Sequence, residues 1–363
     1  MKTSFVPQTP TEATPEWFTH ALRESQTIPT TTRVSAVESS PVGNGLIGVS
    51  VRFELTYEGA DGSVAPQSVV CKFPTANPDL RAAAAGEHVY TRESTFYREL
   101  AQELDVRVPR CFYIAEGKSS DDFVLVLEDL GPAQTSDQIV GCDMSQAEAA
   151  IDSAAGVHAP FWGSPALDSA SWNVRSMWIP QVAQAYPALF AQYSDAFRDK
   201  VSADDLAIGE AFAPVIGEWF AQQPRPWTIT HGDFRLDNML FGIRGGAEPI
   251  GVLDWQTILV GSGVVDVAYF IGTSLPTDVR REHEERLVRR YHAGLLQRGV
   301  KDYSFERCWN DYRYSALLGY FMATYAPMLV KRTERGDQMF AQWLQRVADQ
   351  MRDLDSPALL PSK

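Results

Sequence analysis

The first third of the chain has the alternating pattern of β-strands. Between residues 49 and 57, apolar side chains take every second position and polar ones lie between them, which is the period of a half-buried strand. Other apolar runs and three-to-four-residue periods predict further elements. The expected strands cover residues 34–39, 69–73, 111–115 and 123–127, and the expected helices cover residues 15–25 and 79–104.

The pattern becomes helical after the sequence EDLGP at residues 128–132. Ser145 and Glu148 have the spacing of a capping box, and helical periods continue to the C-terminus except around residues 227–256. We therefore predict an α+β protein with a cleft between two lobes, where small-molecule sites commonly form. The predicted parts are a strand-rich N-terminal lobe (1–127), a hinge linker (128–132) and a mainly helical C-terminal lobe (133–363).

Composition and charge exclude several classes of function. The chain has 32 basic and 46 acidic residues, a net charge of −14, which argues against a protein that binds nucleic acid by neutralising phosphates. It has no apolar run of about 18 residues, as a membrane span requires, and its first residues are not typical of a secretory signal. Four isolated cysteines predict reduced thiols in a cytoplasmic protein, and the six histidines lack the spacing of a zinc hydrolase. His158, on an apolar helix face, is expected to be a satisfied core residue.

The sequence HGDFRLDN at residues 231–238 carries the strongest chemical signal. Phosphoryl transfer from a nucleotide needs a carboxylate to deprotonate the acceptor hydroxyl, oxygen ligands for Mg²⁺ and cations over the phosphates. Asp233 is suited to be the base, Asn238 and the later Asp254 supply oxygen ligands, and Arg235 is placed to reach the transferring phosphate. The alternative is a polar loop in which Asp and Asn only form turns.

A glycine-rich segment precedes the strand at residues 49–57. Gly43, Gly45 and Gly48 match the pattern GxGxxG, which in a dinucleotide-binding fold lies between a strand and a helix. Here a strand follows, so a hairpin flap over nucleotide phosphates is favoured over a nicotinamide-dependent dehydrogenase. An ordinary hairpin turn is the simpler alternative.

A lysine and a glutamate upstream form the third signal. Lys72 interrupts an apolar strand, and Glu93 shares a helix face with Val89, Phe96 and Leu100. A carboxylate on a buried face needs a partner, so we expect an ion pair that aims the Lys72 ammonium at phosphate oxygens. Two side chains that each extend to solvent would be the alternative.

The order of these motifs resembles the aminoglycoside phosphotransferase family of protein-kinase-like enzymes, over roughly residues 40–275. HGDFRLDN is the sharpest match, and residues 253–275 together with the EDL linker resemble the ecdysteroid-kinase-like (CHK) branch. The resemblance implies a protein-kinase-like bilobal fold. It also implies the roles of base for Asp233, Mg²⁺ ligands for Asn238 and Asp254, and phosphate contact for Lys72.

Further roles follow from the same resemblance. Glu93 would position Lys72, and the backbone of Glu128, Asp129 and Leu130 would hold the adenine. Asp266 would be the structural aspartate that braces the catalytic loop, and His231, within the catalytic motif, would orient that loop.

The departures from eukaryotic protein kinases favour a small acceptor. HGD and DWQ replace HRD and DFG, and only 266 − 254 − 1 = 11 residues separate Asp254 from Asp266, too few for a long peptide-docking segment. The hypothesis is therefore an ATP- and Mg²⁺-dependent kinase that phosphorylates a hydroxyl of a small organic molecule. A catalytically inactive kinase-like nucleotide-binding module and a protein kinase are the alternatives.

Overall fold

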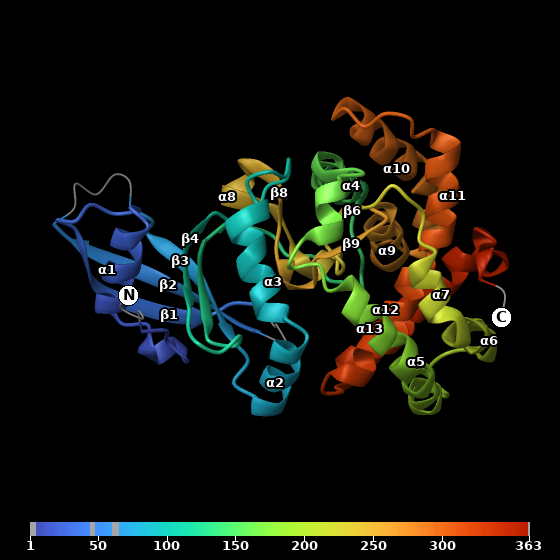
Figure 1. Cartoon of the computed structure of the whole chain (residues 1–363), viewed down its shortest axis with the longest axis horizontal. Helices are drawn as coiled ribbons and strands as arrows, with labels where there is room; N and C mark the ends of the chain where they lie inside the picture. Colours follow the sequence, from blue (N-terminus) through green and yellow to red (C-terminus); the bar gives the residue numbers. More distant parts are fainter. Residues whose placement is uncertain (1–4, 44–47, 60–64, 362–363) are drawn as a thin grey trace. The chain divides into compact units, whose positions relative to one another are not determined.

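The computed structural model describes residues 5–43, 48–59 and 65–361, and the chain divides into two compact units. The first unit comprises Met1–Ala101 and Val108–Gly131, and the second comprises Gln102–Arg107 and Pro132–Lys363 (Figure 1). The chain therefore passes from the first unit to the second, back again, and across once more. The intervening residues 102–107 are bonded into the second unit, where Arg107 O accepts from Val252 N (2.9 Å) and Asp105 N donates to Gly156 O (3.1 Å).

The first unit is built on a five-stranded antiparallel sheet in the order β1-β2-β3-β5-β4. The expected strands are all present, as β1 (Arg33–Pro41), β2 (Gly48–Glu58), β3 (Ser68–Pro74), β4 (Cys111–Glu116) and β5 (Phe123–Glu128). A short 3₁₀ turn (Pro10–Glu12) and helix α1 (Pro15–Glu24) precede the sheet, and the Thr14 hydroxyl caps α1 by accepting from Trp17 N.

Strand alternation decides which side chains of β3 face α1. Phe18 and Leu22 of α1 share one buried core with Cys71 and Phe73 of β3. Because successive side chains of a strand point to opposite faces, Lys72 points away from that core.

The single helix expected at residues 79–104 is wrong. The structure has α2 (Pro78–Gly86), α3 (Val89–Thr95) and a π-helical turn (Phe96–Leu100). Gly86 is a poor helix former, and His88 adopts a left-handed backbone with φ 58°, which ends the run of helical hydrogen bonds. The helical period on which the prediction relied continues across this break.

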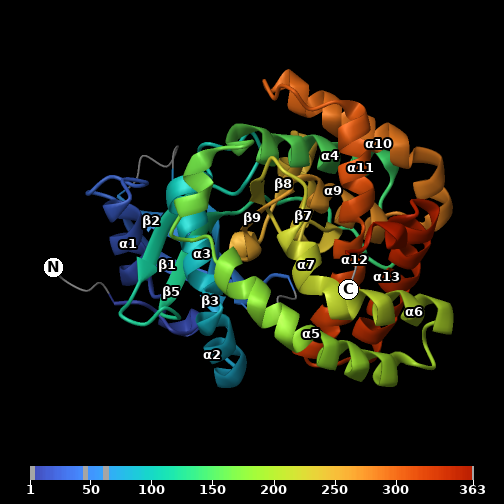
Figure 2. The ribbon, with the colours of Figure 1, turned by 45° about the vertical axis from the view of Figure 1, so that its right-hand side comes forward.

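The second unit is mainly helical and surrounds helix α9 (Val264–Ser274), all of whose residues are buried. Helices α10, α11, α12 and α13 pack against α9 (Figure 2). Two small antiparallel pairs join β6 (Thr228–Thr230) to β9 (Leu259–Gly261) and β7 (Met239–Gly242) to β8 (Glu248–Val252). The other helices are α4 (Met144–His158), α5 (Arg175–Phe197), α6 (Ala203–Phe212), α7 (Ile216–Ala221), α8 (Ile243–Gly246), α10 (Thr277–Gln297), α11 (Phe305–Ser315), α12 (Leu317–Leu329) and α13 (Glu334–Asp353), with short 3₁₀ turns between some of them.

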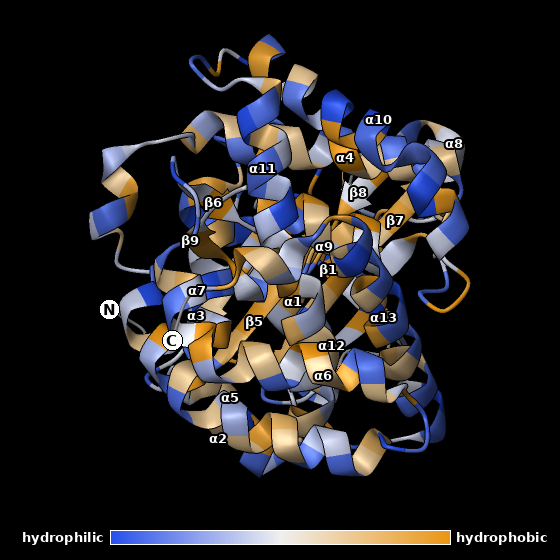
Figure 3. Ribbon diagram, turned by 90° about the vertical axis from the view of Figure 1, so that its right-hand side faces the viewer, coloured by the Kyte–Doolittle hydropathy of each residue, from blue (hydrophilic) through white to orange (hydrophobic). Residues whose placement is uncertain are grey.

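Helix α10 is largely hydrophilic (Figure 3) and is joined to α4 by ion pairs. Arg286 binds Glu148 at 2.5 Å, and Arg290 binds Asp152 at 2.6 Å. Among the described residues, none of the helices combines the length and the apolarity that crossing a bilayer requires.

The capping box of α4 lies two residues before the predicted one. The Asp143 side chain accepts from Gln146 N (2.9 Å), and the Gln146 side chain accepts from Asp143 N (3.3 Å). Asp143 has the extended backbone of an N-cap residue, whereas Ser145 already lies inside the helix and donates its hydroxyl to Asp143. A carboxylate also suits the positive end of the helix dipole, which favours Asp143 as the cap.

Replacing this cap provides a test of the fold. We expect Asp143→Ala to lower the free energy of unfolding by about 1 kcal/mol, because the backbone N–H of Gln146 loses its side-chain acceptor. The Ser145→Ala variant is the matched control and should change it by less than about 0.5 kcal/mol. Urea denaturation measures both, and equal losses would contradict the assignment of the cap.

Candidate active site

The loop between β6 and β7 carries the HGDFRLDN residues and turns sharply at Gly232. Gly232 has φ +81°, a left-handed conformation that favours glycine. A Cβ at this position would lie 2.4 Å from the carbonyl oxygen of Thr257. The turn therefore requires glycine both for its backbone conformation and for the close approach of the next segment.

Asp266, in the first turn of α9, holds this loop by binding the loop's backbone N–H groups. Its carboxylate accepts from the backbone N–H groups of His231 (2.6 Å) and Gly232 (3.1 Å) and is fully buried. His158 Nε2 lies 3.1 Å from the same carboxylate, and its Nδ1 lies 2.8 Å from the Tyr291 hydroxyl. His158 is thus a core histidine with both ring nitrogens bonded, as expected from the sequence.

The His231 ring links the loop to the segment that carries Asp254. Its Nδ1 accepts from Asp233 N (3.3 Å), so Nε2 carries the proton that it donates to the Leu253 carbonyl oxygen (2.8 Å). His231 is fully buried, and its ring packs against Trp255 at 4.7 Å between centroids. Both ring nitrogens are engaged with backbone groups, one in the loop and one in the segment before Asp254.

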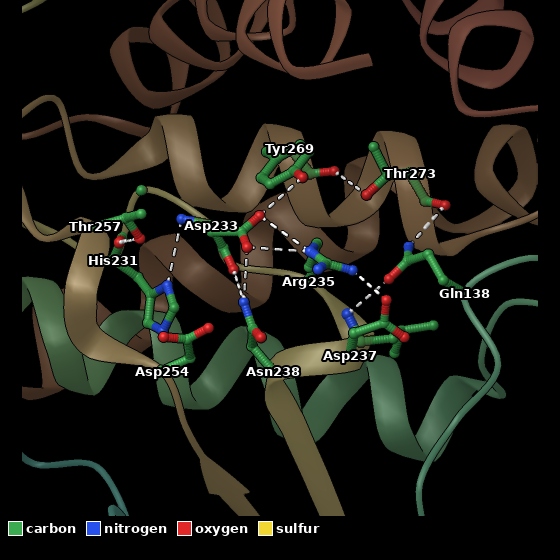
Figure 4. A network of polar contacts seen from close by, with 12 residues as sticks. Gln138, His231, Asp233, Arg235, Asp237, Asn238, Asp254, Thr257, Tyr269 and Thr273 are labelled. Carbon is green, nitrogen blue, oxygen red and sulfur yellow. Dashed lines mark hydrogen bonds and ion pairs between the residues drawn. The ribbon is translucent and has the colours of Figure 1, made fainter. Parts of the chain in front are cut away.

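Three side chains donate to the carboxylate of Asp233 (Figure 4). Arg235 Nε lies 3.1 Å from both oxygens, Asn238 Nδ2 lies 2.9 Å from Oδ2, and the Tyr269 hydroxyl lies 3.0 Å from Oδ1. Burial alone would raise the pKa of Asp233, but the Arg235 charge and the hydrogen bonds from Arg235 and Asn238 hold that pKa below its usual range. Asp233 is therefore an anion at neutral pH.

Arg235 has partners that the sequence did not predict. Its guanidinium pairs with Asp237 as well as Asp233, and its central carbon lies 5.4 Å from the centre of the Trp343 ring. Burial would lower the pKa of Arg235, yet the Asp233 carboxylate raises it, so the side chain remains a cation. In this structure the positive charge of Arg235 is balanced within its own loop.

Asn238 and the segment before Asp254 are joined by the backbone. Leu253 N donates to Asn238 O (2.8 Å), and Asp254 follows directly with a left-handed φ of +63°. Asn238 donates its Nδ2 to the carbonyl and carboxylate oxygens of Asp233, which leaves the amide oxygen Oδ1 as its candidate ligand atom. Figure 4 shows the side chains of Asn238 and Asp254 on the same side of the loop.

These two oxygen donors fit a magnesium ion that arrives with phosphates. Mg²⁺ is typically held by one or two protein side chains together with waters and substrate phosphates. Within residues 5–43, 48–59 and 65–361, no group of three or more His, Cys, Asp or Glu residues could bind a metal ion by itself. Asn238 Oδ1 and the Asp254 carboxylate are oxygen donors of the kind that Mg²⁺ takes from protein side chains.

The first unit places Lys72 and Glu93 in an ion pair. Lys72 Nζ of β3 lies 2.7 Å from Glu93 Oε2 of α3, and the two side chains are 10% and 1% exposed. Gly48 of β2 lies beside them, since a Cβ there would come within 3.1 Å of Lys72 Cε. Gly43 has a left-handed φ of +71°, and Gly45 lies outside the described residues.

Several polar groups of the EDL segment (residues 128–130) are already hydrogen-bonded within the first unit. The Asp129 carboxylate binds Arg52 (2.6 Å) and accepts from the Ser68 hydroxyl (2.8 Å). Glu128 N donates to Arg110 O at 2.8 Å, and Leu130 is buried. Backbone contacts to an adenine would therefore have to come from groups of this segment other than the Glu128 N–H.

Two residues of the site were missed in the sequence. Tyr269 lies three positions after Asp266, so both share the face of α9 that meets the loop, and this spacing could have identified it. Gln138 bridges Leu236 N (3.0 Å) to Thr273 O (3.2 Å), but it lies in an irregular segment whose pattern gives no comparable signal.

Comparisons with known proteins agree with this architecture. A model described as a phosphotransferase enzyme family matches residues 53–307. Among solved structures, the microcompartment-associated aminopropanol kinase is 14% identical with a TM-score of 0.54, covering 94% of this chain and 99% of that one. The gentamicin–APH(2")-IIa complex is 16% identical with a TM-score of 0.52, covering 88% and 94%. These likenesses confirm the predicted α+β, kinase-like fold class.

A short local match also exists among curated proteins. A 42-residue stretch is 50% identical to mouse acyl-CoA dehydrogenase family member 10, covering 12% of this chain and 4% of that protein. A match of this length shows a related segment and says nothing about the activity of the whole mouse protein.

The turn at Gly232 can be tested by adding one methyl group. We expect Gly232→Ala to lower the free energy of unfolding by more than about 3 kcal/mol, because a left-handed backbone and a clash with Thr257 O act together. Gly246→Ala is the matched control, since Gly246 has φ +94° but nothing within 4 Å of its added Cβ. That variant should lose only about 1–2 kcal/mol, and similar losses in thermal denaturation would contradict the close approach.

Proposed function

Because the chain belongs to the phosphotransferase enzyme family, we propose that it transfers the γ-phosphoryl group of ATP to a hydroxyl of a small organic molecule. The observation that carries this proposal is the anionic carboxylate of Asp233, held by three side-chain donors on a loop that Asp266 fixes. A fixed anion at this position can orient an acceptor hydroxyl and accept its proton.

The reaction requires one bond to form and one to break. The acceptor oxygen forms a bond to the γ-phosphorus, the bond from that phosphorus to the β,γ-bridging oxygen breaks, and its electron pair leaves with ADP. The hydroxyl proton passes to Asp233. Since the transition state of phosphoryl transfer is loose, a carboxylate of low pKa suffices as the base and acts mainly by orienting the hydroxyl.

The remaining proposed residues would bind the nucleotide. Asn238 and Asp254 would hold Mg²⁺, which supplies positive charge to the phosphates when bound. Lys72, fixed by Glu93, would contact the α- and β-phosphates, and Arg235 would contact the transferring phosphate after leaving Asp233.

The other nucleotide contacts are proposed on backbone groups. Gly43, Gly45 and Gly48 would cover the phosphates, and the backbone of residues 128–130 would hold the adenine. Glu128 contributes no N–H to this contact, because that group is bonded to Arg110 O.

A small acceptor is favoured over a protein by the segment after Asp254. It consists of a short turn at Trp255–Thr257 and the three-residue strand β9 before α9 begins at Val264. This compact connection has no long exposed segment on which a peptide could dock. Amino alcohols and aminoglycosides are reasonable first acceptors to test, because the two structural neighbours are named for such compounds.

The assignment of the base predicts a specific loss of turnover. ATP consumption should be screened across hydroxyl-bearing compounds, and the product identified by mass as heavier by one phosphoryl group. With an active acceptor, Asp233→Asn should lower kcat by at least about 100-fold, because general-base catalysis is typically worth that factor. Asp237→Asn, in the same loop, is the control and should lose less than about tenfold. Wild-type turnover by Asp233→Asn would overturn the assignment. ATP binding without turnover on any acceptor would favour the inactive module.

The ion pair of the first unit predicts non-additive effects. Lys72→Met and Glu93→Gln should each reduce kcat/KM for ATP by roughly 10- to 100-fold, since either change removes the oriented ammonium. The double variant should be little worse than Lys72→Met alone, because the residues act as a pair. Exposed Lys118 provides the control variant Lys118→Met, which should have the wild-type value. Steady-state kinetics with varied ATP measure these values, and multiplicative losses would contradict the pair.

A further inference from the structure

Tyr269 joins the buried helix α9 to the carboxylate of Asp233. Its hydroxyl lies 3.0 Å from Asp233 Oδ1, and the side chain is fully buried. Burial, followed by the negative charge of Asp233, raises the pKa of the Tyr269 phenol well above its usual range. The phenol therefore remains protonated and acts toward Asp233 as a hydrogen-bond donor.

The Tyr269 ring has little freedom to move. It packs edge-on against Trp343 of α13 at 6.1 Å between centroids, and its backbone oxygen accepts from the Thr273 hydroxyl (2.8 Å). Helix α13 also holds α9 directly. Gln350 Nε2 donates to Ala268 O (3.3 Å), and Arg346 donates to Thr273 O (3.0 Å) at the end of α9. A donor on so constrained a ring fixes the direction from which it reaches Asp233.

The other donors to Asp233 differ in this respect. Arg235 has a long side chain that is shared with Asp237, and we have assigned it a second role at the phosphate. Asn238 binds Oδ2 from within the same loop, so it moves with Asp233. Tyr269 is thus the donor that ties Oδ1 to an element outside the loop.

We propose that Tyr269 is a positioning residue for phosphoryl transfer, holding the Asp233 carboxylate in the orientation that receives the proton of the acceptor hydroxyl. This inference rests on the proposed function. The phenol neither gains nor loses a proton in the reaction. Its contribution is to keep the Asp233 oxygens from rotating when Arg235 leaves the carboxylate.

The first test removes only the hydroxyl. Tyr269→Phe should lower kcat roughly tenfold, because a misoriented base reduces the fraction of productive encounters. KM for ATP should stay within about twofold, since Tyr269 has no assigned contact with the nucleotide. Tyr320→Phe is the matched control. Tyr320 is equally buried and donates to the Asp205 carbonyl oxygen at 2.7 Å, so this variant should lose stability but retain the wild-type kcat. An unchanged kcat in Tyr269→Phe, or a parallel rise in KM for ATP, would overturn the proposal.

The second test does not depend on turnover. In a double-mutant cycle, Tyr269→Phe should lower the equilibrium constant for folding roughly tenfold in the wild-type background and less than about twofold in the Asp233→Ala background. Equal effects in both backgrounds would show that the hydrogen bond is absent. If the wild type is active, this result would overturn the role of Tyr269 and leave the proposed function intact. A coupled cycle in a protein that phosphorylates no acceptor would instead overturn the proposed function, and the role of Tyr269 in transfer with it.

Discussion

The candidate site depends on one buried carboxylate, Asp266, and on the backbone groups that it accepts. Two consecutive N–H groups, of His231 and Gly232, donate to it, and no regular secondary structure could satisfy them in so sharp a turn. A buried anion in turn requires such donors, so loop and helix stabilise each other. The bond from His231 to Leu253 then extends this order to the residue before Asp254. The charged side chains of the site are held in defined positions because the backbone that carries them is fixed.

The sequence predicted those elements in which local pattern and tertiary environment agree. Strand β2 alternates because one of its faces is buried, and Lys72 stands out because it breaks an apolar strand. The helix break at His88 could not be predicted, because a left-handed residue leaves the apolar period on either side almost intact. The cap of α4 was placed two residues late for a related reason. Asp143 and Ser145 are both good caps, and only the backbone conformation distinguishes them.

For the site, residue types were easier to predict than partners. The Lys72–Glu93 pair could be expected because burial leaves a carboxylate few choices. The pairing of Arg235 with Asp233 and Asp237 could not be expected, since a long arginine side chain can turn toward phosphate or toward its neighbours with similar local geometry. Trp343 lies in α13, more than 100 residues after the loop, and its contact with Arg235 depends on how several helices pack.

The short excursion of residues 102–107 into the second unit has a consequence for modularity. Because the chain crosses between the units three times, no single cut separates all of the first unit from all of the second. A cut after residue 131 would separate residues 102–107 from the rest of the second unit, and with them the Arg107 carbonyl that accepts from Val252 N, two residues before Asp254. The same cut would remove the close neighbour of Gly156. The Asp105 carbonyl oxygen lies so near that a Cβ added at Gly156 would be 1.9 Å from it. Gene fusion or exchange between relatives at a single junction would therefore disturb the support of the segment that carries Asp254, which favours inheritance of the two units together.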